Sequence, residues 1–298
     1  GASGFIGKHL VPHLVKNAAP GTQVHTVGRK PLQNSSAIHH VMDLLDEKMV
    51  SNLVEELKPA QVFHLVGISQ IRPDYGMEQY FQVNFLTTLH LLRAFETLSL
   101  KTRFFFASSM HVYGNQEVVI DENSGTKPLS HYAFTKLLAE EALRAGVTKN
   151  PNLTAIVGRL YSCFGPGQPE GFVAADLCKK ISELPEKDSV LQVGPLDSYR
   201  RFLDVRDVVQ AISLLMEKPL ASRYEIFNIA SPHELEIRQM IDILLKLSGK
   251  NPKIQSTESS FNQFRGLKIK LDKLQSVVPT EIFRPVEETL RDMLSGRQ

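Results

Sequence analysis

The sequence predicts an α/β fold with a doubly wound parallel sheet and a smaller, mainly C-terminal second domain. Two observations predict the sheet. Apolar strands alternate with helices over the first 160 residues, and a glycine-rich turn runs straight into the first helix. Strands that are apolar on both faces are typical of parallel sheets covered by helices on both sides. Glycine and proline crowd residues 165–171, which predicts that the chain leaves the sheet there.

The elements are predicted from the period of the apolar residues. In chain order, we expect a helix at 5–16, strands at 23–28 and 61–66, a helix at 77–98, a strand at 103–109, a helix at 131–144 and a strand at 152–160. Three consecutive phenylalanines in the strand at 103–109 favour burial on both faces. Beyond the glycine and proline cluster we expect a helix at 172–183, a strand at 189–193, a helix at 206–217, a strand at 224–230 and a mainly helical remainder ending in 286–294.

These elements group into two predicted domains. Residues 1–160, completed by about 201–230, form a nucleotide-binding domain, and residues 161–200 and 231–298 form a substrate domain. The active site is expected in the cleft between them. In such a fold the turn at Gly1 follows a buried strand, so we expect a strand of about five or six residues upstream of this numbering.

Composition limits the partners. The chain has 298 residues, is 42% hydrophobic and 22% charged, and carries a formal net charge of +2 from interspersed acidic and basic residues. We therefore expect a small molecule, rather than nucleic acid or a membrane, as the main partner. Cys163 and Cys178 have neither metal-ligand spacing nor a disulfide framework, which favours a cytoplasmic protein without a metal site. We expect no signal peptide and no transmembrane span.

Tyr132 and Lys136 lie four residues apart and so share one face of a predicted helix. An isolated tyrosine has a pKa of about 10. A lysine one turn away can stabilise the phenolate, so the pair could exchange a proton near neutral pH. The same spacing also arises by chance on solvated helices.

A glycine-rich turn, Gly1-Ala-Ser-Gly4-Phe-Ile-Gly7, precedes the first helix. Glycines let the backbone approach a pyrophosphate, and the amino end of the helix offers free N–H groups and a positive dipole. A dinucleotide site and a simple glycine-rich helix cap both fit this turn, and the alternating strands and helices favour the dinucleotide.

Basic residues follow the next strand, at the position that reads the adenosine ribose. Arg29 and Lys30 occupy the place where an acidic residue would bind the ribose hydroxyls of NAD. The basic pair favours the 2′-phosphate of NADP(H), with NAD(H) still possible and a solvated surface turn as the alternative. Asp43 could accept a hydrogen bond from the adenine amino group or could cap a helix.

Ser109 follows the phenylalanine-rich strand at its carboxyl end, the edge where open parallel sheets bind their ligands. Its hydroxyl could hold a substrate carbonyl beside Tyr132. A plain turn is the alternative, because serine and glycine favour turns.

In combination, these motifs resemble the extended short-chain dehydrogenases/reductases, the NAD-dependent epimerase/dehydratase family. The resemblance rests on the glycine turn, His64-Leu-Val-Gly67, Asn84, Ser109 ahead of Val-Tyr-Gly, and Tyr132 with Lys136. It implies a Rossmann-type domain that binds NAD(P) and a C-terminal domain that binds a nucleotide-diphosphate sugar. The cofactor-binding residues that it implies are Gly1, Gly4, Phe5, Ile6, Gly7, Arg29, Asp43, Leu44, Leu65, Val66, Gly67, Asn84, Tyr132 and Lys136.

Later segments look most like GDP-4-keto-6-deoxy-mannose reductases and their GDP-mannose dehydratase relatives. By that resemblance Arg200 would contact the substrate diphosphate, with Arg265 as a second candidate, and an arginine fork suits phosphate oxygens. The substrate-binding residues implied are Ser109, His111, Ser162, Phe172, Val173, Arg200 and Arg265.

Two departures from the family pattern narrow the activity. Dehydratases carry Asp and Glu immediately after the hydroxyl residue, and this chain has Met110 and His111 there. Methionine cannot transfer a proton, so dehydration is disfavoured, as is the epimerisation performed by GDP-fucose synthases, which have a cysteine at the Met110 position. His111 could act as an acid or base, or make local hydrogen bonds only. Ser162 replaces the usual asparagine of its segment.

Three functions follow as hypotheses. The first is an NADP-dependent reductase of the C4 carbonyl of a nucleotide-diphospho-4-keto-6-deoxy-hexose, with a GDP sugar favoured. In it Tyr132 donates the proton, Ser109 orients the oxygen, and Lys136 holds the nicotinamide ribose and lowers the tyrosine pKa. The second is a nucleotide-sugar 4-epimerase, which fits Arg29 poorly. The third is a non-catalytic NAD(P)-binding sensor or scaffold, which has no need of these three residues.

The resemblance also implies a homodimer. In the family, the helices equivalent to 77–98 and 131–144 pair across a two-fold axis as a four-helix bundle. Leu89, Leu92 and Phe95 could supply apolar contacts there. The alternative is that this apolar stripe faces the chain's own sheet.

Overall fold

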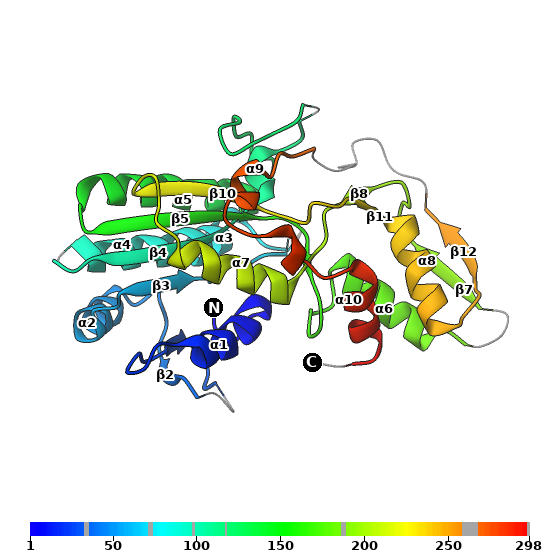
Figure 1. The fold of residues 1–298 in the computed structure, drawn as a ribbon, viewed down its shortest axis with the longest axis horizontal. Coiled ribbons are helices and arrows are strands. Elements are labelled where there is room, and N and C mark those ends of the chain that lie inside the picture. Colours follow the sequence, from blue (N-terminus) through cyan, green and yellow to red (C-terminus); the bar gives the residue numbers. More distant parts are fainter. Residues whose placement is uncertain are drawn as a thin grey trace.

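The computed structural model describes residues 1–32, 36–70, 74–96, 99–116, 118–185, 189–257 and 268–296. It has a larger lobe built on a parallel sheet and a smaller lobe beside it (Figure 1). In the described ranges, no helix is long and apolar enough to cross a membrane.

A four-stranded parallel sheet forms the centre of the larger lobe. Its strand order is β10-β5-β4-β3, and its strands are β3 (Gln61–His64), β4 (Thr102–Ser109), β5 (Leu153–Leu160) and β10 (Tyr224–Ile229). The chain's long central strands, β4 and β5, end together at the pair Ser109–Leu160. Polar residues that follow them therefore gather at one edge of the sheet.

Two further strands, β1 (His25–Gly28) and β2 (Ile38–Val41), pair in parallel as a separate ladder. Gly1 lies against Leu65, directly after β3, because a Cβ on Gly1 would be 2.6 Å from the Leu65 carbonyl carbon. The glycine turn is thereby placed at the carboxyl end of β3.

Helices cover both faces of the central sheet. They are α1 (Phe5–Asn17), α2 (Glu47–Leu57), α4 (Thr87–Glu96), α5 (His131–Lys149) and α7 (Val205–Glu217). Phe105 points to the core on the α7 side, whereas Phe104 and Phe106 point to the core on the α4 and α5 side. All three rings are fully buried. The phenylalanine run is thus explained by strand alternation between two covered faces.

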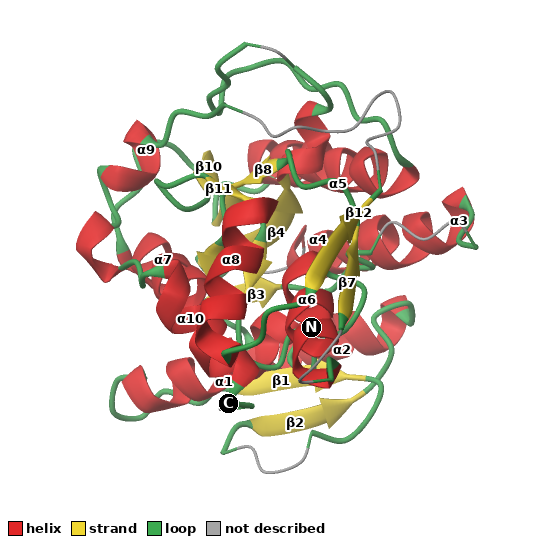
Figure 2. Ribbon diagram, turned by 90° about the vertical axis from the view of Figure 1, so that its right-hand side faces the viewer, coloured by secondary structure: helices red, strands yellow, loops and turns green. Residues whose placement is uncertain are grey.

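The smaller lobe packs helices around its own apolar core. Its helices are α6 (Val173–Glu183), α8 (Ile237–Ser248) and α10 (Val286–Leu294), and its core includes Phe164, Ile181, Met240, Leu244 and Leu290. Short strand pairs flank them: β7 (Val190–Val193) with β12 (Lys253–Ser256), β8 (Tyr199–Arg200) with β11 (Leu235–Glu236), and β6 (Cys163–Phe164) with β9 (Leu203–Asp204). Figure 2, which views the molecule from the side of this lobe, shows α6, α8 and α10 together in front of the central strands β3 and β4.

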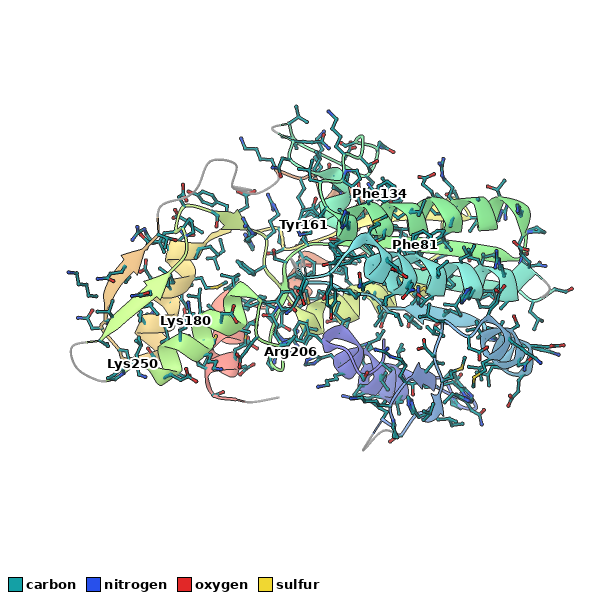
Figure 3. All side chains as sticks on the ribbon, turned by 180° about the vertical axis from the view of Figure 1, so that it is seen from behind. Phe81, Phe134, Tyr161, Lys180, Arg206 and Lys250 are labelled. Atoms are coloured by element: carbon teal, nitrogen blue, oxygen red, sulfur yellow. The ribbon has the colours of Figure 1, made fainter. Side chains whose placement is uncertain are left out.

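Arg206 connects the lobes at the position labelled in Figure 3. Its guanidinium bonds Asp204 at 2.7 Å and Asp292 of α10 at 2.8 Å. Thr289 of α10 also donates to Asp204 at 2.7 Å. Because Asp204 caps α7, these contacts fix the C-terminal helix to the larger lobe.

Several element boundaries differ from the sequence predictions. The strand predicted at 61–66 ends at His64, and the helix predicted at 131–144 continues to Lys149. The long helix predicted from Met77 is α3 (Met77–Tyr80), a π-helical segment η1 (Phe81–Leu86) and α4 in succession. Strand β2 and helix α2 were not predicted at all. The remaining short elements are η2 (Met110–Tyr113), α9 (Asp272–Gln275) and η3 (Thr280–Ile282).

Candidate active site

The glycine turn forms a tight backbone cradle at the amino end of α1. A Cβ on Gly7 would lie only 2.1 Å from the carbonyl oxygen of Gly1, so no side chain fits at that position. Gly4 is the N-cap residue, and no side chain caps this helix end. The cradle therefore fits a pyrophosphate, which would accept hydrogen bonds from the first-turn N–H groups.

Helix α5 presents Tyr132, Lys136 and Glu140 along one buried face. Ser130 caps the helix by accepting a hydrogen bond from Ala133 N at 3.2 Å, which fixes where the helix begins. All three side chains are buried. The spacing predicted for Tyr132 and Lys136 thus brings both beside the carboxyl end of β4 and its Ser109.

Tyr132 lies between Ser109, His111 and Tyr80. Its hydroxyl shares a hydrogen bond with Ser109, and its ring centroid is 5.9 Å from that of His111 and 6.4 Å from that of Tyr80. Burial raises the pKa of Tyr132, and the Ser109 hydrogen bond offsets only part of this rise. This direction differs from the lowering expected from Lys136, because burial dominates. The tyrosine holds its proton through neutral pH.

Lys136 is directed at the sheet and at the turn after β3. Its Nζ donates to the carbonyl oxygen of Ala107 at 2.8 Å and lies 5.0 Å from the centre of the Phe106 ring. A Cβ on Gly67 would lie 2.7 Å from that same Nζ, so a side chain there would crowd the lysine. Burial lowers the pKa of Lys136 to about 8, although the charge of Glu140 acts in the opposite direction.

The lowered lysine pKa predicts a pH-dependent stability difference between the wild type and Lys136→Met. Between pH 8 and 10.5 the unfolded chain binds more protons at this lysine than the folded protein does. Stability rises with pH wherever the unfolded state binds more protons. We therefore expect the wild type to gain stability relative to the variant between pH 8 and pH 10. Urea unfolding at both pH values measures this, and an unchanged or opposite trend would contradict it.

Ser109 ends β4 and caps the short helix η2. Its Oγ accepts from His111 N at 3.3 Å. Ser109 is therefore an extended strand residue that caps the next helix, rather than part of a plain turn, and its hydroxyl also interacts with Tyr132.

A buried ion pair beneath the site escaped the sequence prediction. Arg159 Nη2 of β5 donates to Glu140 Oε2 at 2.7 Å, and both side chains are at most 4% exposed. Ser108 donates to the same carboxylate. The i, i+4 spacing of Lys136 and Glu140, on the face already marked by Tyr132, was the signal that could have revealed Glu140.

Asn84 holds the turn that follows β3. Its Oδ1 accepts from Ile68 N at 2.7 Å, and its Nδ2 donates to Thr135 Oγ1 of α5 at 3.2 Å. Leu65, Val66 and Gly67 lie between His64 and this anchor. Of the cofactor-binding residues predicted in this turn, Gly67 lies next to Lys136 and Leu65 lies against Gly1.

At the predicted adenosine end, Arg29 is exposed at the end of β1. Asp43 Oδ1 accepts from Leu45 N at 3.0 Å, and the carbonyl oxygen of Leu44 accepts from His90 at 2.9 Å. Asp46, rather than Asp43, caps the next helix. The helix-cap alternative for Asp43 is therefore wrong.

On the substrate side, the structure brings His111 and Arg200 together. Burial lowers the pKa of His111, and the nearby positive charge of Arg200 lowers it further. Ser162 and Phe172 are partly buried, whereas Val173 is 40% exposed at the start of α6. Arg265 lies outside the described residues.

Contacts between the loops beside Tyr132 were also missed. Tyr80 donates its hydroxyl hydrogen to the Gln70 carbonyl oxygen at 2.9 Å, and the Gln70 amide donates to the Glu170 carbonyl oxygen at 2.9 Å. His9 of α1 contacts the Pro166 carbonyl oxygen at 2.9 Å. The segment 165–171 is thus attached both to α1 and to the segment after β3.

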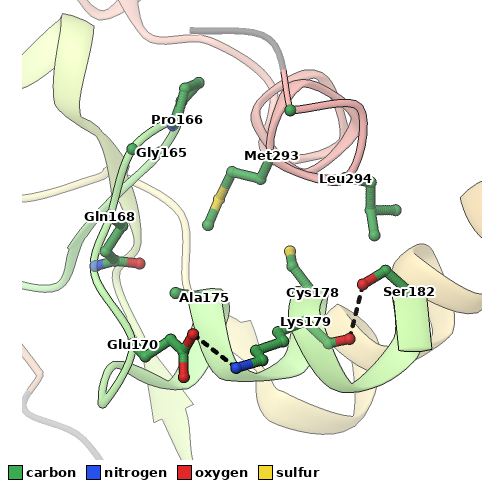
Figure 4. A pocket seen from close by; sticks show the side chains of 12 residues that line it. Gly165, Pro166, Gln168, Glu170, Ala175, Cys178, Lys179, Ser182, Met293 and Leu294 are labelled. Atoms are coloured by element: carbon green, nitrogen blue, oxygen red, sulfur yellow. Dashed lines mark hydrogen bonds and ion pairs between the residues drawn. The ribbon is translucent and has the colours of Figure 1, made fainter. Parts of the chain in front are cut away.

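A cavity of about 370 Å³ lies between this segment, α6 and the end of α10 (Figure 4). Gln168, Cys178 and Met293 line it, and the ion pair between Lys179 and Glu170 spans its edge at 2.7 Å. Its lining includes none of Ser109, Tyr132 and Lys136. The three predicted catalytic residues therefore lie outside this cavity. Among the residues that the structure describes, no cluster of His, Cys, Asp and Glu could hold a metal ion.

Two of the apolar residues proposed for a dimer interface are buried within the chain. Leu92 and Phe95 pack in the core between the helices and the sheet, and the Phe95 ring meets Phe104 edge-on at 6.1 Å. They are unavailable to a second subunit, so their assignment is wrong. Leu89 remains partly exposed, and Phe134 on the adjacent α5 is 47% exposed.

Three features define the class of protein to which this chain belongs. They are a Rossmann-type sheet, a glycine cradle at a helix amino end and a buried Ser-Tyr-Lys group. Together they indicate an oxidoreductase-like protein that uses a nucleotide. The model of the NAD dependent epimerase/dehydratase family matches residues 1–230, and the chain belongs to this family. A relative is the GDP-6-deoxy-D-mannose reductase of Pseudomonas aeruginosa. It is 31% identical over 255 residues, which are 83% of this chain and 78% of that protein.

Solved structures agree with the fold. RMD from Pseudomonas aeruginosa complexed with NADPH superposes with a TM-score of 0.83 at 28% identity, covering 100% of this chain and 96% of that one. MoeE5 in complex with UDP-glucose and NAD has a TM-score of 0.83 at 27% identity, covering 99% and 96%. The family resemblance and the α/β fold predicted from the sequence are confirmed.

Proposed function

We propose that this protein is an NADP-dependent reductase of the C4 carbonyl of a nucleotide-diphospho-4-keto-6-deoxy-hexose, with the GDP-linked mannose derivative as the favoured substrate. The observation that carries the proposal is the buried Tyr132 hydroxyl, hydrogen-bonded to Ser109 and kept protonated by burial. A protonated tyrosine is the form that carbonyl reduction consumes. The 31% identical GDP-6-deoxy-D-mannose reductase supports the substrate class.

The cofactor assignment follows from the cradle and the residues around it. The first turn of α1 would hold the pyrophosphate, and the turn at 65–67 with Asn84 and Lys136 would hold the nicotinamide half. Bound NADPH supplies a hydride to the substrate. Arg29 would face the 2′-phosphate at the adenosine end. We assign this role to the larger lobe, residues 1–160 with 201–230, and sugar-nucleotide binding to residues 161–200 and 231–298.

The protein side chains then complete the reduction. Tyr132 donates its hydroxyl proton to the carbonyl oxygen as negative charge develops there, and Ser109 donates a hydrogen bond to the same oxygen. Arg200 would bind the diphosphate of the substrate, and His111 beside it would contact the sugar. Met110 offers no proton, so the site lacks the acid pair of a dehydratase.

Turnover assays separate this reductase from the epimerase that shares its residues. We expect stoichiometric NADPH oxidation with GDP-4-keto-6-deoxy-mannose. Interconversion of two nucleotide sugars without net cofactor change would show an epimerase instead. A thermal-stabilisation screen with NADPH, NADH, GDP, UDP, CDP and dTDP identifies the preferred cofactor and the preferred nucleotide of the substrate, because ligands that bind the native state raise its stability.

The cofactor preference can be tested at the end of β1. Replacing Arg29 with serine removes a charge-assisted contact to the 2′-phosphate, so we expect the Kd for NADPH to rise about tenfold or more. The Kd for NADH serves as the internal control and should change little. Equal increases in the Kd values for NADPH and NADH would show that Arg29 does not bind the 2′-phosphate.

We also propose a homodimer through a four-helix bundle of the α4 and α5 helices of two subunits. The exposed Phe134 and the partly exposed Leu89 support it. A charge buried in an interface is costly, so Phe134→Glu is expected to sediment as a monomer where the wild type sediments as a dimer. A monomeric wild type at micromolar concentration would rule the bundle out.

A further inference from the structure

The imidazole of His39 forms hydrogen bonds that hold the turn containing Arg29 in place. His39 of β2 lies opposite Thr26 of β1 in the parallel ladder. Its Nδ1 is 2.8 Å from Thr26 Oγ1, and its Nε2 is 2.9 Å from the carbonyl oxygen of Lys30. The ring therefore spans from the middle of β1 to the second residue beyond its end.

The hydrogen-bond partners of His39 determine which of its ring nitrogens carries the proton. A carbonyl oxygen only accepts hydrogen bonds, so Nε2 carries the proton and donates to Lys30. In the neutral ring Nδ1 is then an acceptor, and the hydroxyl of Thr26, a residue that is only 5% exposed, donates to it. Both nitrogens are occupied, which fixes the ring between the Thr26 side chain and the Lys30 backbone.

The residue held in this way is Arg29. It lies between Gly28, whose carbonyl oxygen accepts from Met42 N at 3.0 Å, and Lys30, whose carbonyl oxygen accepts from His39. The backbone on both sides of Arg29 is therefore anchored to β2 or to the residue after it. An exposed arginine on an anchored turn loses less conformational freedom when it binds an anion than one on a loose turn.

We propose that His39 is a positioning residue for the adenosine end of the cofactor site, where it holds the turn at Arg29 in place to favour NADPH over NADH. The inference rests on the cofactor preference proposed above. It assigns part of that preference to a residue on the neighbouring strand that need not touch the cofactor.

The test is a binding measurement rather than an activity assay. The Kd values for NADPH and NADH are obtained by nucleotide fluorescence titration for the wild type and for His39→Leu. The variant removes both hydrogen bonds, and we expect its NADPH affinity to fall about fivefold, the cost of ordering a loosened turn, with little change for NADH. Thr26→Val, which removes only the Nδ1 partner, is expected to show a smaller shift in the same direction.

His40→Leu provides the matched control. His40 is the next residue of β2, and its Nε2 contacts His25 Nδ1 at 2.9 Å instead of the turn. Successive strand residues point to opposite faces, so this change should leave the ratio of the two Kd values unaltered. Combining His39→Leu with Arg29→Ser should give no further loss than Arg29→Ser alone, because the histidine acts through the arginine.

The possible outcomes are distinct. A wild type that binds NADPH more tightly than NADH, with an unchanged ratio in both His39→Leu and Thr26→Val, overturns the role of His39 and leaves the proposed function standing. A wild type with no preference overturns both the cofactor assignment and this inference. Should His39→Leu fail to fold, the Thr26→Val ratio decides.

Discussion

Replacing Tyr132 with phenylalanine is expected to lower kcat for carbonyl reduction by about 10² to 10⁴-fold, the usual contribution of a positioned proton donor. The ring keeps its packing against His111 and Tyr80, so the fold should persist. The affinity for NADPH should also persist, because the variant loses only a hydroxyl. Steady-state kinetics with GDP-4-keto-6-deoxy-mannose, together with NADPH titration, measure both.

Tyr80→Phe is the matched control for this experiment. Tyr80 lies beside Tyr132, but its hydroxyl bonds the Gln70 carbonyl oxygen. Removing that hydroxyl should affect turnover far less than removing that of Tyr132. Unchanged turnover in Tyr132→Phe would contradict the proton-transfer role of Tyr132 and support a non-catalytic NAD(P)-binding protein.

The largest stability effect is expected at Arg159. Replacing it with methionine leaves the Glu140 carboxylate buried without its cation, and breaking a buried pair in this way costs about 3–5 kcal/mol. The Ser108 hydrogen bond to Glu140 remains and offsets only part of this cost. Urea unfolding of the wild type and the variant measures the difference.

Two comparisons identify the cause of that loss. Adding Glu140→Leu to Arg159→Met removes the unpaired charge, so the double variant should be more stable than Arg159→Met alone. Arg144→Met breaks the exposed pair with Glu141 on the same helix and should change stability little. A loss at Arg144 as large as that at Arg159 would show that burial is not the cause.

Much of the fold could be predicted because its signals are local. The alternation of apolar strands and helices located β4, β5 and α5, since a strand buried on both faces has a distinctive sequence. Strand β2 was missed because Ile-His-His-Val carries two histidines and little apolar character. Helix α2 was missed although Val50, Val54 and Leu57 repeat at helical spacing, so its omission has no such explanation. The short strand pairs of the smaller lobe depend on partners distant in sequence, which no local pattern reveals.

The sequence by itself determined the family, the doubly wound sheet and the Ser109, Tyr132 and Lys136 set, because motif spacing and helical period are properties of short segments. Only the tertiary structure decided how these groups are charged. Burial, which depends on residues far along the chain, raises the pKa of Tyr132 and lowers that of Lys136 to about 8. The tertiary structure likewise placed Leu92 and Phe95 in the core and joined Arg159 to Glu140, since both depend on how α4 and α5 pack on the sheet.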